Sequence, residues 1–203
     1  MARTACIAIP TRGRPAQLAT TLASIAQQAA AREVEIVVVD DGPDDATRDA
    51  ALRYGATYLV AGAPGGPNAA RNRAFDATSA DLVILLDDDI RAWDGWLDAL
   101  LAADAEQPAD VAVLAGPIIA SLDPAYAPRS CGRHGSWVTE LDEGDADCDL
   151  RNGWSANMAV RRDWYRRAGP FDEAHAIGGD EEEWTGRVRD AGGRIRYIAA
   201  AGV

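Results

Sequence analysis

The chain has 203 residues, of which 32 are acidic and 20 basic, and its net charge is −12 with no lysine at all. Such an acidic chain is a poor candidate for coating nucleic acid or an anionic membrane, although it is compatible with a local pocket of arginines for phosphate. Hydrophobic residues make up 48% of the sequence, which indicates a globular protein, and the length suits a single domain over residues 1–203.

Three further features bear on where the protein works. No stretch approaches the roughly 20 apolar residues that span a bilayer, so we expect no membrane span. The N-terminus enters a short apolar run that ends at Pro10, which is typical of a strand and a turn rather than of a signal peptide. Three cysteines, an odd number, do not form a disulfide framework, so we expect a cytoplasmic protein.

In the first half of the chain, short β-rich runs alternate with helical stretches. The pattern predicts strands at residues 5–9, 35–39, 57–60, 82–86 and 111–114. It predicts helices at residues 17–30, 46–54, 68–76 and 95–103. This order is typical of an α/β fold with a mostly parallel, Rossmann-like sheet flanked by helices. The strand at 82–86 is wholly apolar, which predicts a central position in the sheet.

The second half is less regular. Between residues 117 and 151 no long period survives, and we interpret this part as an irregular segment. Regular structure resumes at residues 152–160. The pattern then predicts helices at 161–168 and 180–191 and a last strand at 194–199.

The most informative feature is the triplet Asp87-Asp88-Asp89, which follows the central strand directly. Three adjacent carboxylates repel one another unless a cation or several donors lie among them. An oxygen-rich site of this kind suits Mg²⁺ or Mn²⁺ that bridges a diphosphate, with Asp89 as a ligand. Asp87 or Asp88 would then reach ribose hydroxyls or the water of the metal. The alternative is an exposed acidic turn.

Polar residues also follow two other strands, and ligands bind beyond the carboxyl ends of strands in such sheets. Asp41 follows the second strand and could accept hydrogen bonds from a nucleobase or from hydroxyls, or it could belong to a turn or helix cap. Arg12 and Arg14 follow the first strand, and Arg71 lies near the start of a helix after a glycine-rich loop. Guanidinium groups suit phosphate oxygens, although each arginine could instead pair with a surface carboxylate.

An acidic run, Asp180-Glu181-Glu182-Glu183, opens a helix near the end of the chain. Acidic residues in a first turn favour the helix dipole, but four in succession exceed what capping needs. One of them could act as a general base that takes a proton from an acceptor hydroxyl. Helical spacing places Asp180 and Glu183 on one face and directs Glu181 elsewhere.

Two cysteines and a histidine raise the question of a zinc site. Cys131, His134 and Cys148 lie within 18 positions of one another, but their spacing fits no standard zinc pattern. Cys6 is expected to be a buried strand residue.

The ordered set of motifs resembles the GT-A fold glycosyltransferases, closest to family 2 with its inverting members. Five segments carry the resemblance, in order: Ile9-Pro10-Thr11-Arg12-Gly13-Arg14-Pro15, Val38-Val39-Asp40-Asp41-Gly42, Ala70-Arg71-Asn72, Leu86-Asp87-Asp88-Asp89, and Asn157-Met158-Ala159-Val160-Arg161-Arg162 with the following run to Asp180-Glu181. The run at 178–183 is also similar to the acidic motif of β-1,4-galactosyltransferases. The resemblance covers essentially the whole chain except segment 117–151.

The resemblance implies roles for single residues. The residues that it places at the nucleotide are Pro10, Thr11, Arg12, Arg14, Asp41, Arg71, Asp87 and Asp88. Asp89 and Asp87 match the last and first carboxylates of the DxD motif, which holds the metal. Glu181 falls on the position of the catalytic base. Because the family usually has Glu-Asp where this chain has Asp180-Glu181, the choice between these two stays open.

As a whole, the resemblance implies a metal-dependent inverting transferase. The donor would be a nucleoside diphosphate sugar, most simply a UDP-sugar, and an acceptor hydroxyl would receive the sugar as a β-glycoside with Mn²⁺ or Mg²⁺ present. Residues 1–104 would bind the donor, and residues 105–203 would form a smaller, mixed region for the acceptor and the base. A histidine that often supplies another metal ligand in the family would follow residue 203.

Sugar contacts and two rival functions complete the predictions. Trp137, Trp154 and Trp184 could stack on sugar faces or pack in the core, and Ser155 and Asn157 are weaker candidates for sugar contact. A nucleotidyltransferase would be expected to carry a glycine- and lysine-rich loop. A non-catalytic nucleotide-sugar binding module is the other alternative.

Overall fold

The computed structural model of the protein describes residues 3–62, 65–119, 140–175 and 178–203. Its strands are β1 (Ala5–Thr11), β2 (Glu35–Asp40), β3 (Thr57–Val60), β4 (Leu82–Leu86), β5 (Val111–Ala115), β6 (Cys148–Leu150), β7 (Asn157–Arg161) and β8 (Arg194–Tyr197). Its helices are α1 (Pro15–Ala31), α2 (Asp45–Arg53), α3 (Gly66–Ala77), α4 (Trp96–Glu106), α5 (Arg162–Ala168) and α6 (Asp180–Asp190).

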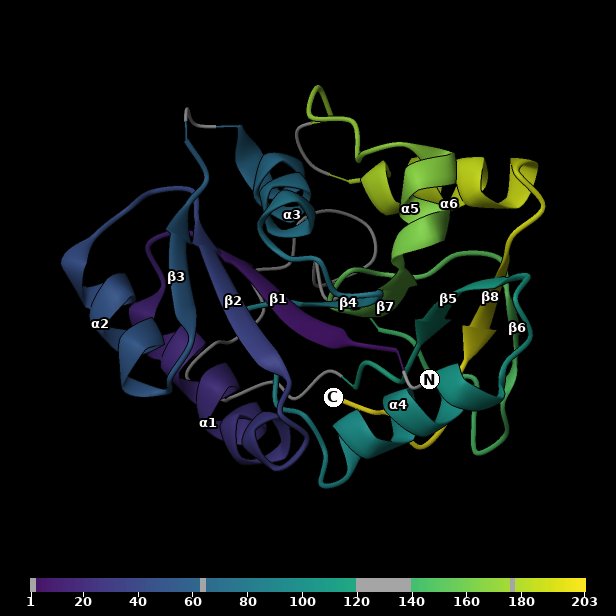
Figure 1. Ribbon diagram of the computed structural model, residues 1–203, viewed down its shortest axis with the longest axis horizontal. Coiled ribbons are helices and arrows are strands. Elements are labelled where there is room, and N and C mark those ends of the chain that lie inside the picture. Colours follow the sequence, from purple (N-terminus) through teal and green to yellow (C-terminus); the bar gives the residue numbers. More distant parts are fainter. Residues whose placement is uncertain (1–2, 63–64, 120–139, 176–177) are drawn as a thin grey trace, which may run out of the picture.

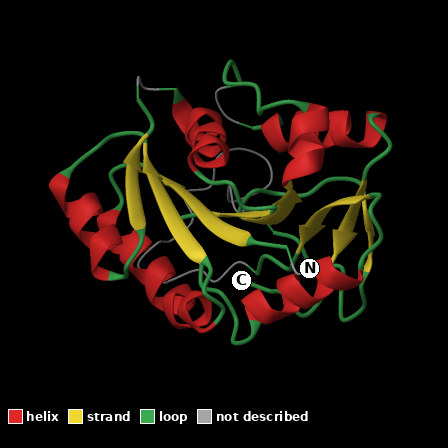
Figure 2. Cartoon of the chain, in the orientation of Figure 1, coloured by secondary structure: helices red, strands yellow, loops and turns green. Residues whose placement is uncertain are grey.

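These elements form three layers. Within the described residues a single sheet of eight strands lies between helices α3, α5 and α6 on one face and α1, α2 and α4 on the other (Figure 1). Figure 2 shows the same layers by type of structure, with the strands between the helices. None of the helices in the described ranges is long and apolar enough to cross a membrane.

The elements predicted from the sequence are present, with shifts of a few residues at their ends. One prediction was wrong: strand β6 lies inside segment 117–151, which we expected to be irregular. Its three residues pair with β8, and so short an element leaves no periodic pattern. Cys131, His134 and Trp137 lie outside the described residues, so the predictions for them are not tested.

The strand order explains how the two halves of the chain meet. The order is β3-β2-β1-β4-β7-β5-β8-β6, with parallel pairs from β3 to β4. Strand β7 runs antiparallel to both β4 and β5, which confirms a mostly parallel sheet with a mixed second part. In this register Asn157 lies opposite Leu86. The start of β7 therefore lies at the same sheet edge as the end of β4.

Apolar side chains on both sheet faces hold the layers together. On α1, Leu18, Leu22, Ile25 and Ala29 are buried at helical spacing, and Pro15 suits the first position of the helix. All five residues of β4 are fully buried, which confirms the predicted central strand. Burial of this apolar surface is the main driving force for the fold.

One buried ion pair fastens the second half of the sheet to α4. The side chains of Arg161 and Asp104 are each 5% exposed, and Arg161 Nε lies 2.7 Å from Asp104 Oδ1. The remaining guanidinium nitrogens donate to the carbonyls of residues 104, 107, 108 and 111. Arg161 thus satisfies carbonyls at and beyond the end of α4. The sequence had suggested that it begins a helix, whereas it ends β7.

Candidate functional site

Polar residues from six segments meet at one edge of the sheet. Because β1, β2 and β4 are parallel, their carboxyl ends share this edge, and the turn before β7 joins them. The first turn of α6 lies beside α3 there, since Arg71 contacts both Asp180 and Glu181. The structure therefore brings together most of the residues that the sequence predicted for one site.

The three aspartates after β4 have three different environments. Asp88 is fully buried, accepts a hydrogen bond of 2.5 Å from Thr11 Oγ1, and lies 2.6 Å from Arg14 Nη2. The side chain of Asp89 is 48% exposed and lies 2.8 Å from Arg14 Nη1. Asp87 is partly buried, and its carboxylate accepts no hydrogen bond from the described part of the chain.

Two of the predicted nucleotide contacts have buried side chains. Asp88 and Thr11, which is 4% exposed, use their side chains to join the ends of β4 and β1. Their contacts with a nucleotide stay predictions. The accessible carboxylates of the triplet are Asp87 and Asp89.

Asp87 is an unfavourably placed anion. Burial raises the pKa of Asp87 to about 6, and the charges of Asp89, Glu181 and Asp88 add to the effect against the opposing charge of Arg71. A carboxylate that burial and like charges destabilise gains from a nearby cation. In the residues that the structure describes, no group of three or more His, Cys, Asp or Glu side chains could hold a metal alone.

Two neighbouring aspartates at the end of β2 have different contacts. Asp40 is fully buried and accepts hydrogen bonds from Gly42 N and from the Tyr58 hydroxyl, both at 2.9 Å. Asp41 is 8% exposed and accepts a hydrogen bond of 3.2 Å from Gly65 N at the start of α3. Asp40 therefore shapes the turn, while Asp41 lies between this loop and α3.

Two arginines of the first loop line the same edge and are more open. Arg12 is 67% exposed in its side chain and lies 3.4 Å from Asp41 Oδ2. The side chain of Arg14 is 47% exposed, although it contacts the aspartate triplet. Pro10, which is partly buried, belongs to β1 just before them. The guanidinium of Arg12 is largely exposed, whereas both Nη atoms of Arg14 contact carboxylates of the triplet.

The acidic start of α6 is held by a single arginine. Arg71 Nη1 lies 2.6 Å from Asp180 Oδ2, and Arg71 Nη2 lies 3.3 Å from Glu181 Oε1. Asn68 Oδ1 accepts a further hydrogen bond of 2.6 Å from Arg71 Nη1. Arg71 is only 6% exposed. In this arrangement two carboxylates and an amide contact its Nη atoms, and its contact with a nucleotide stays a prediction.

Asp180 has a lowered proton affinity. Burial alone would raise the pKa of Asp180, but its hydrogen bond with Glu181 and the charge of Arg71 together hold that pKa below the ordinary value. Asp180 is therefore a poor proton acceptor. Helical spacing had directed Glu181 away from Asp180, whereas both carboxylates contact Arg71; Glu183 pairs with Arg187 at 2.6 Å.

Two of the predicted sugar contacts are core residues. Trp184 is fully buried, stacks on Phe171 with ring centroids 4.7 Å apart, and donates its indole N–H to Gly169 O. Asn157 is fully buried as well and bonds to Trp96 Nε1 and to the carbonyls of Pro117 and Ala201. Core packing, one of the two alternatives for Trp184, is therefore what the structure shows, and the contact of Asn157 with a sugar stays a prediction.

The other two candidates lie just before β7. Ser155 is 2% exposed and donates a hydrogen bond of 2.6 Å to Glu181 Oε1, so it serves the acidic helix rather than a sugar. Trp154 is partly buried against the core cluster of the α1 and α4 face, and its contact with a sugar stays a prediction. No motif in the sequence had pointed to the contact between Ser155 and Glu181, because it joins residues on different elements.

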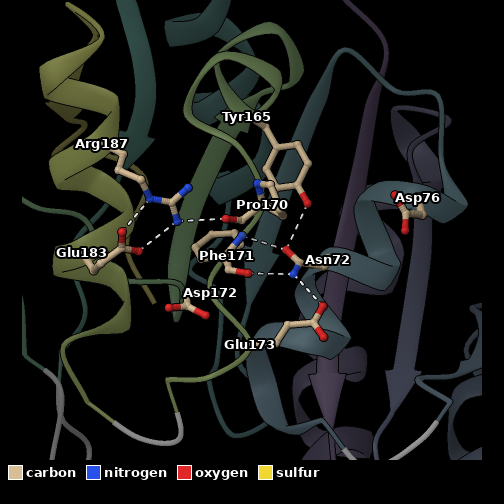
Figure 3. A pocket seen from close by; sticks show the side chains of 9 residues that line it. All are labelled: Asn72, Asp76, Tyr165, Pro170, Phe171, Asp172, Glu173, Glu183 and Arg187. Carbon is tan, nitrogen blue, oxygen red and sulfur yellow. Dashed lines mark hydrogen bonds and ion pairs between the residues drawn. The ribbon is translucent and has the colours of Figure 1, made fainter.

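The pocket drawn in Figure 3 lies apart from this site. Its volume is about 630 Å³, and it lies between α3 and the α5–α6 side of the molecule. Asn72 lines it and makes hydrogen bonds to Tyr165, to both backbone polar groups of Phe171 and to Glu173. Of the acidic run that opens α6, Glu183 lines this pocket, whereas Asp180 and Glu181 do not. Asn72, from the third motif, fastens the loop before α6.

Comparison with known proteins adds independent findings. Residues 6–169 match the family model described as Glycosyl transferase family 2. Over 168 residues the chain is 26% identical to glycosyltransferase AglE of Haloferax volcanii. The aligned region covers 80% of this chain and 53% of that protein. Over 213 residues it is 31% identical to validoxylamine A glucosyltransferase of Streptomyces hygroscopicus subsp. jinggangensis, which covers 87% of this chain and 49% of the relative. The chain thus spans about half the length of these curated relatives.

Solved structures show the same fold at low identity. GalNAc-T7, solved with UDP, GalNAc and Mn²⁺, superposes with a TM-score of 0.74 at 15% identity over 98% of this chain and 43% of that one. A mannosyltransferase from Pyrobaculum calidifontis, solved with GDP-Man and Mn²⁺, gives 0.70 at 18% identity over 100% of this chain and 56% of that one. Residues 1–349 of TarS from S. aureus give 0.72 at 18% identity over 97% of this chain and 58% of that one.

Proposed function

The chain belongs to glycosyl transferase family 2, and from this premise we propose that it transfers a sugar from a nucleoside diphosphate sugar to an acceptor hydroxyl. One observation carries the proposal. Accessible carboxylates after β4, two open arginines, the loop of Asp41 and the separate acidic start of α6 meet at one sheet edge. Donor binding needs the carboxylates and arginines, and proton transfer needs a base such as those at the start of α6. The reaction requires the two at adjacent positions.

We assign Asp41 as the residue that recognises the nucleobase of the sugar donor. A carboxylate accepts the hydrogen bond of a uracil imide N–H, and Asp41 lies where β2 ends beside Arg12 and the start of α3. We assign UDP as the nucleotide of the donor. The UDP complex of GalNAc-T7 supports this choice, whereas the mannosyltransferase complex contains GDP-Man, so guanine is the alternative that a binding experiment must exclude.

The divalent cation is assigned to Asp89 and Asp87. The environment of Asp87 fits a cation, because burial and like charges raise its pKa and no described donor satisfies its carboxylate. Two carboxylates leave room for diphosphate oxygens to complete the ligand set. Two solved structures with this fold contain Mn²⁺, and Mg²⁺ has the same preference for oxygen. When bound, the cation would stabilise negative charge on the leaving diphosphate.

The protein side chains perform the remaining steps. Arg12 and Arg14 are exposed enough to donate to the diphosphate as it leaves. Glu181 takes the proton of the acceptor hydroxyl, and the acceptor oxygen attacks the anomeric carbon from the side opposite the diphosphate. An α-linked donor then gives a β-glycoside. Asp180 stays ionised because its pKa is held low.

Titration calorimetry with UDP, GDP and dTDP, each with and without Mn²⁺, tests the donor assignment. We expect UDP to bind most tightly and only weakly without Mn²⁺. Asp41→Asn and Asp89→Asn should each weaken binding by about tenfold or more, since each removes a charged partner. Asp94→Asn is the matched control, because Asp94 is exposed in the same connection after β4.

Three outcomes would count against the proposal. Equal binding of the three nucleotides would contradict the role of Asp41. Metal-dependent UDP binding without transfer of any sugar would indicate a binding module instead. The absence of nucleotide binding would overturn the whole proposal.

A further inference from the structure

Ser155 connects the turn before β7 to the proposed base on α6. Its hydroxyl donates a hydrogen bond of 2.6 Å to Glu181 Oε1 across 26 positions of sequence. Ser155 is 2% exposed, so its hydroxyl is shielded from solvent and from substrate. A hydroxyl that donates to a carboxylate makes a short, charge-assisted hydrogen bond.

The backbone around Ser155 is fixed independently of Glu181. Asn157 N donates to Trp154 O at 3.0 Å, which closes a tight turn around Ser155. Asp87 N lies 3.4 Å from Ala156 O, which attaches this turn to the end of β4. The buried side chain of Asn157 donates to Pro117 O and Ala201 O, at 3.0 and 2.7 Å. Ser155 therefore holds Glu181 from a rigid support at the sheet edge.

Two donors contact one oxygen of Glu181. Ser155 Oγ lies 2.6 Å and Arg71 Nη2 lies 3.3 Å from Oε1, whereas no N–H or O–H group of the described residues donates to Oε2. The side chain of Glu181 is 17% exposed, compared with 8% for Asp180. The carboxyl of Asp180 contacts the other guanidinium nitrogen of Arg71 and the carboxyl of Glu181. The two donors thus fix Oε1 of Glu181 and leave Oε2 without a donor among the described residues.

We propose that Ser155 is the positioning residue of the catalytic base: it fixes Oε1 of Glu181 and so directs Oε2 to the acceptor hydroxyl. The proposal rests on the proposed transferase function and deepens it. It also resolves the choice between Asp180 and Glu181 in favour of Glu181. The proton passes from the acceptor hydroxyl to Oε2 while the bond between the anomeric carbon and the diphosphate breaks, so no other reactant is needed.

Steady-state kinetics of Ser155→Ala with Mn²⁺ and a UDP-sugar test this role. A misaligned base lowers kcat by about tenfold or more, whereas the KM of the donor and the affinity for UDP stay unchanged. Ser155→Thr keeps the hydroxyl and should recover most of kcat. Ser155→Cys has nearly the size of serine with a weaker donor and should fall between alanine and wild type.

Thr185→Val is the matched control. Thr185 is fully buried and donates to the backbone carbonyl of Glu181 at 2.6 Å, so this variant removes a buried hydroxyl near the same residue without touching its carboxylate. We expect its kcat to stay within about twofold of wild type. A purely structural effect would lower kcat alike in Thr185→Val and Ser155→Ala.

A double-mutant cycle with Glu181→Gln completes the test. If Ser155 acts through Glu181, Ser155→Ala lowers kcat in the wild-type background and causes no further loss in the Glu181→Gln background. Wild-type kcat in Ser155→Ala, or the same loss in both backgrounds, would overturn the proposal. The absence of turnover in the wild type would instead overturn the proposed function itself, so the two failures are distinguishable.

Discussion

The guanidinium of Arg71 lies 2.6 Å from the carboxylate of Asp180, and their side chains are 7% and 8% exposed. The two residues are 109 positions apart, on α3 and α6. Arg71 also contacts Glu181, so one buried cation compensates two carboxylates at the proposed site.

Arg71→Gln should destabilise the protein strongly. Breaking a buried pair leaves carboxylates without compensation, and the free energy of unfolding should fall by about 3–5 kcal/mol. Urea denaturation at pH 7 measures this loss. Arg48→Gln removes a half-exposed partner of Asp45 and should change the free energy of unfolding by less than about 1 kcal/mol. Similar small losses in both variants would contradict the compensation of charge by Arg71.

The same ion pair predicts a pH dependence. The folded pKa of Asp180 is below its ordinary value of 3.8, so its contribution to stability is fully present above that pH. The contribution is lost as the pH falls through the lower, folded value. The difference in unfolding free energy between wild type and Asp180→Asn should therefore shrink below about pH 4. A difference that grows on acidification would contradict the assignment.

Asp87→Asn should stabilise the metal-free protein. The pKa of Asp87 is raised from 3.8 to about 6, so below pH 3.8 the carboxyl is neutral in both folded and unfolded states. As the pH rises from 3.8 to 6 only the unfolded state ionises, and the wild type loses stability relative to the variant. Above pH 6 the advantage of the variant is constant at about 1–3 kcal/mol.

Thermal and urea unfolding between pH 3 and 8, with a chelator present, measure this advantage. Asp94→Asn should show no such step between pH 3.8 and 6. The stabilised Asp87→Asn variant should also lose Mn²⁺-dependent UDP binding. An Asp87→Asn variant that was no more stable than the wild type and still bound UDP with Mn²⁺ would contradict the account. Asp87 would then neither destabilise the metal-free protein nor bind the cation.

Asp104→Ala tests the pair that joins α4 to β7. The change leaves the guanidinium of Arg161 buried without its carboxylate, and the free energy of unfolding should fall by about 3–5 kcal/mol. Asp98→Ala removes the exposed partner of Arg32 and should lose less than about 1 kcal/mol. Equal effects in urea denaturation would show that burial of the Arg161 pair is unimportant.

Local patterns of the sequence were sufficient to predict the first half of the fold. Strands β1 to β4 alternate with helices, and each connection returns the chain to the same sheet edge. The apolar run of β4 and the polar residues after β1, β2 and β4 therefore indicated where the site lies. The position of β7 between β4 and β5 was not predictable in this way, because antiparallel pairing of distant segments leaves no local signal.

The same limit applies to the environments of the site residues. Three adjacent aspartates look alike in a sequence, whereas in the structure Asp88 is the buried one and is contacted by Thr11 and Arg14. Trp184 is followed four residues later by Val188, and both are fully buried on the inner face of α6. This helical spacing could have favoured the core position of Trp184 over a sugar contact.

The most direct test of the central claim is the turnover of a UDP-sugar with Mn²⁺ by wild type, Glu181→Gln and Asp180→Asn, with UDP affinity measured on the same samples. We predict that Glu181→Gln lowers kcat by about a hundredfold or more, the usual contribution of a general base, and leaves UDP affinity unchanged. Asp180→Asn should keep more activity than Glu181→Gln. Wild-type turnover in Glu181→Gln would contradict the account.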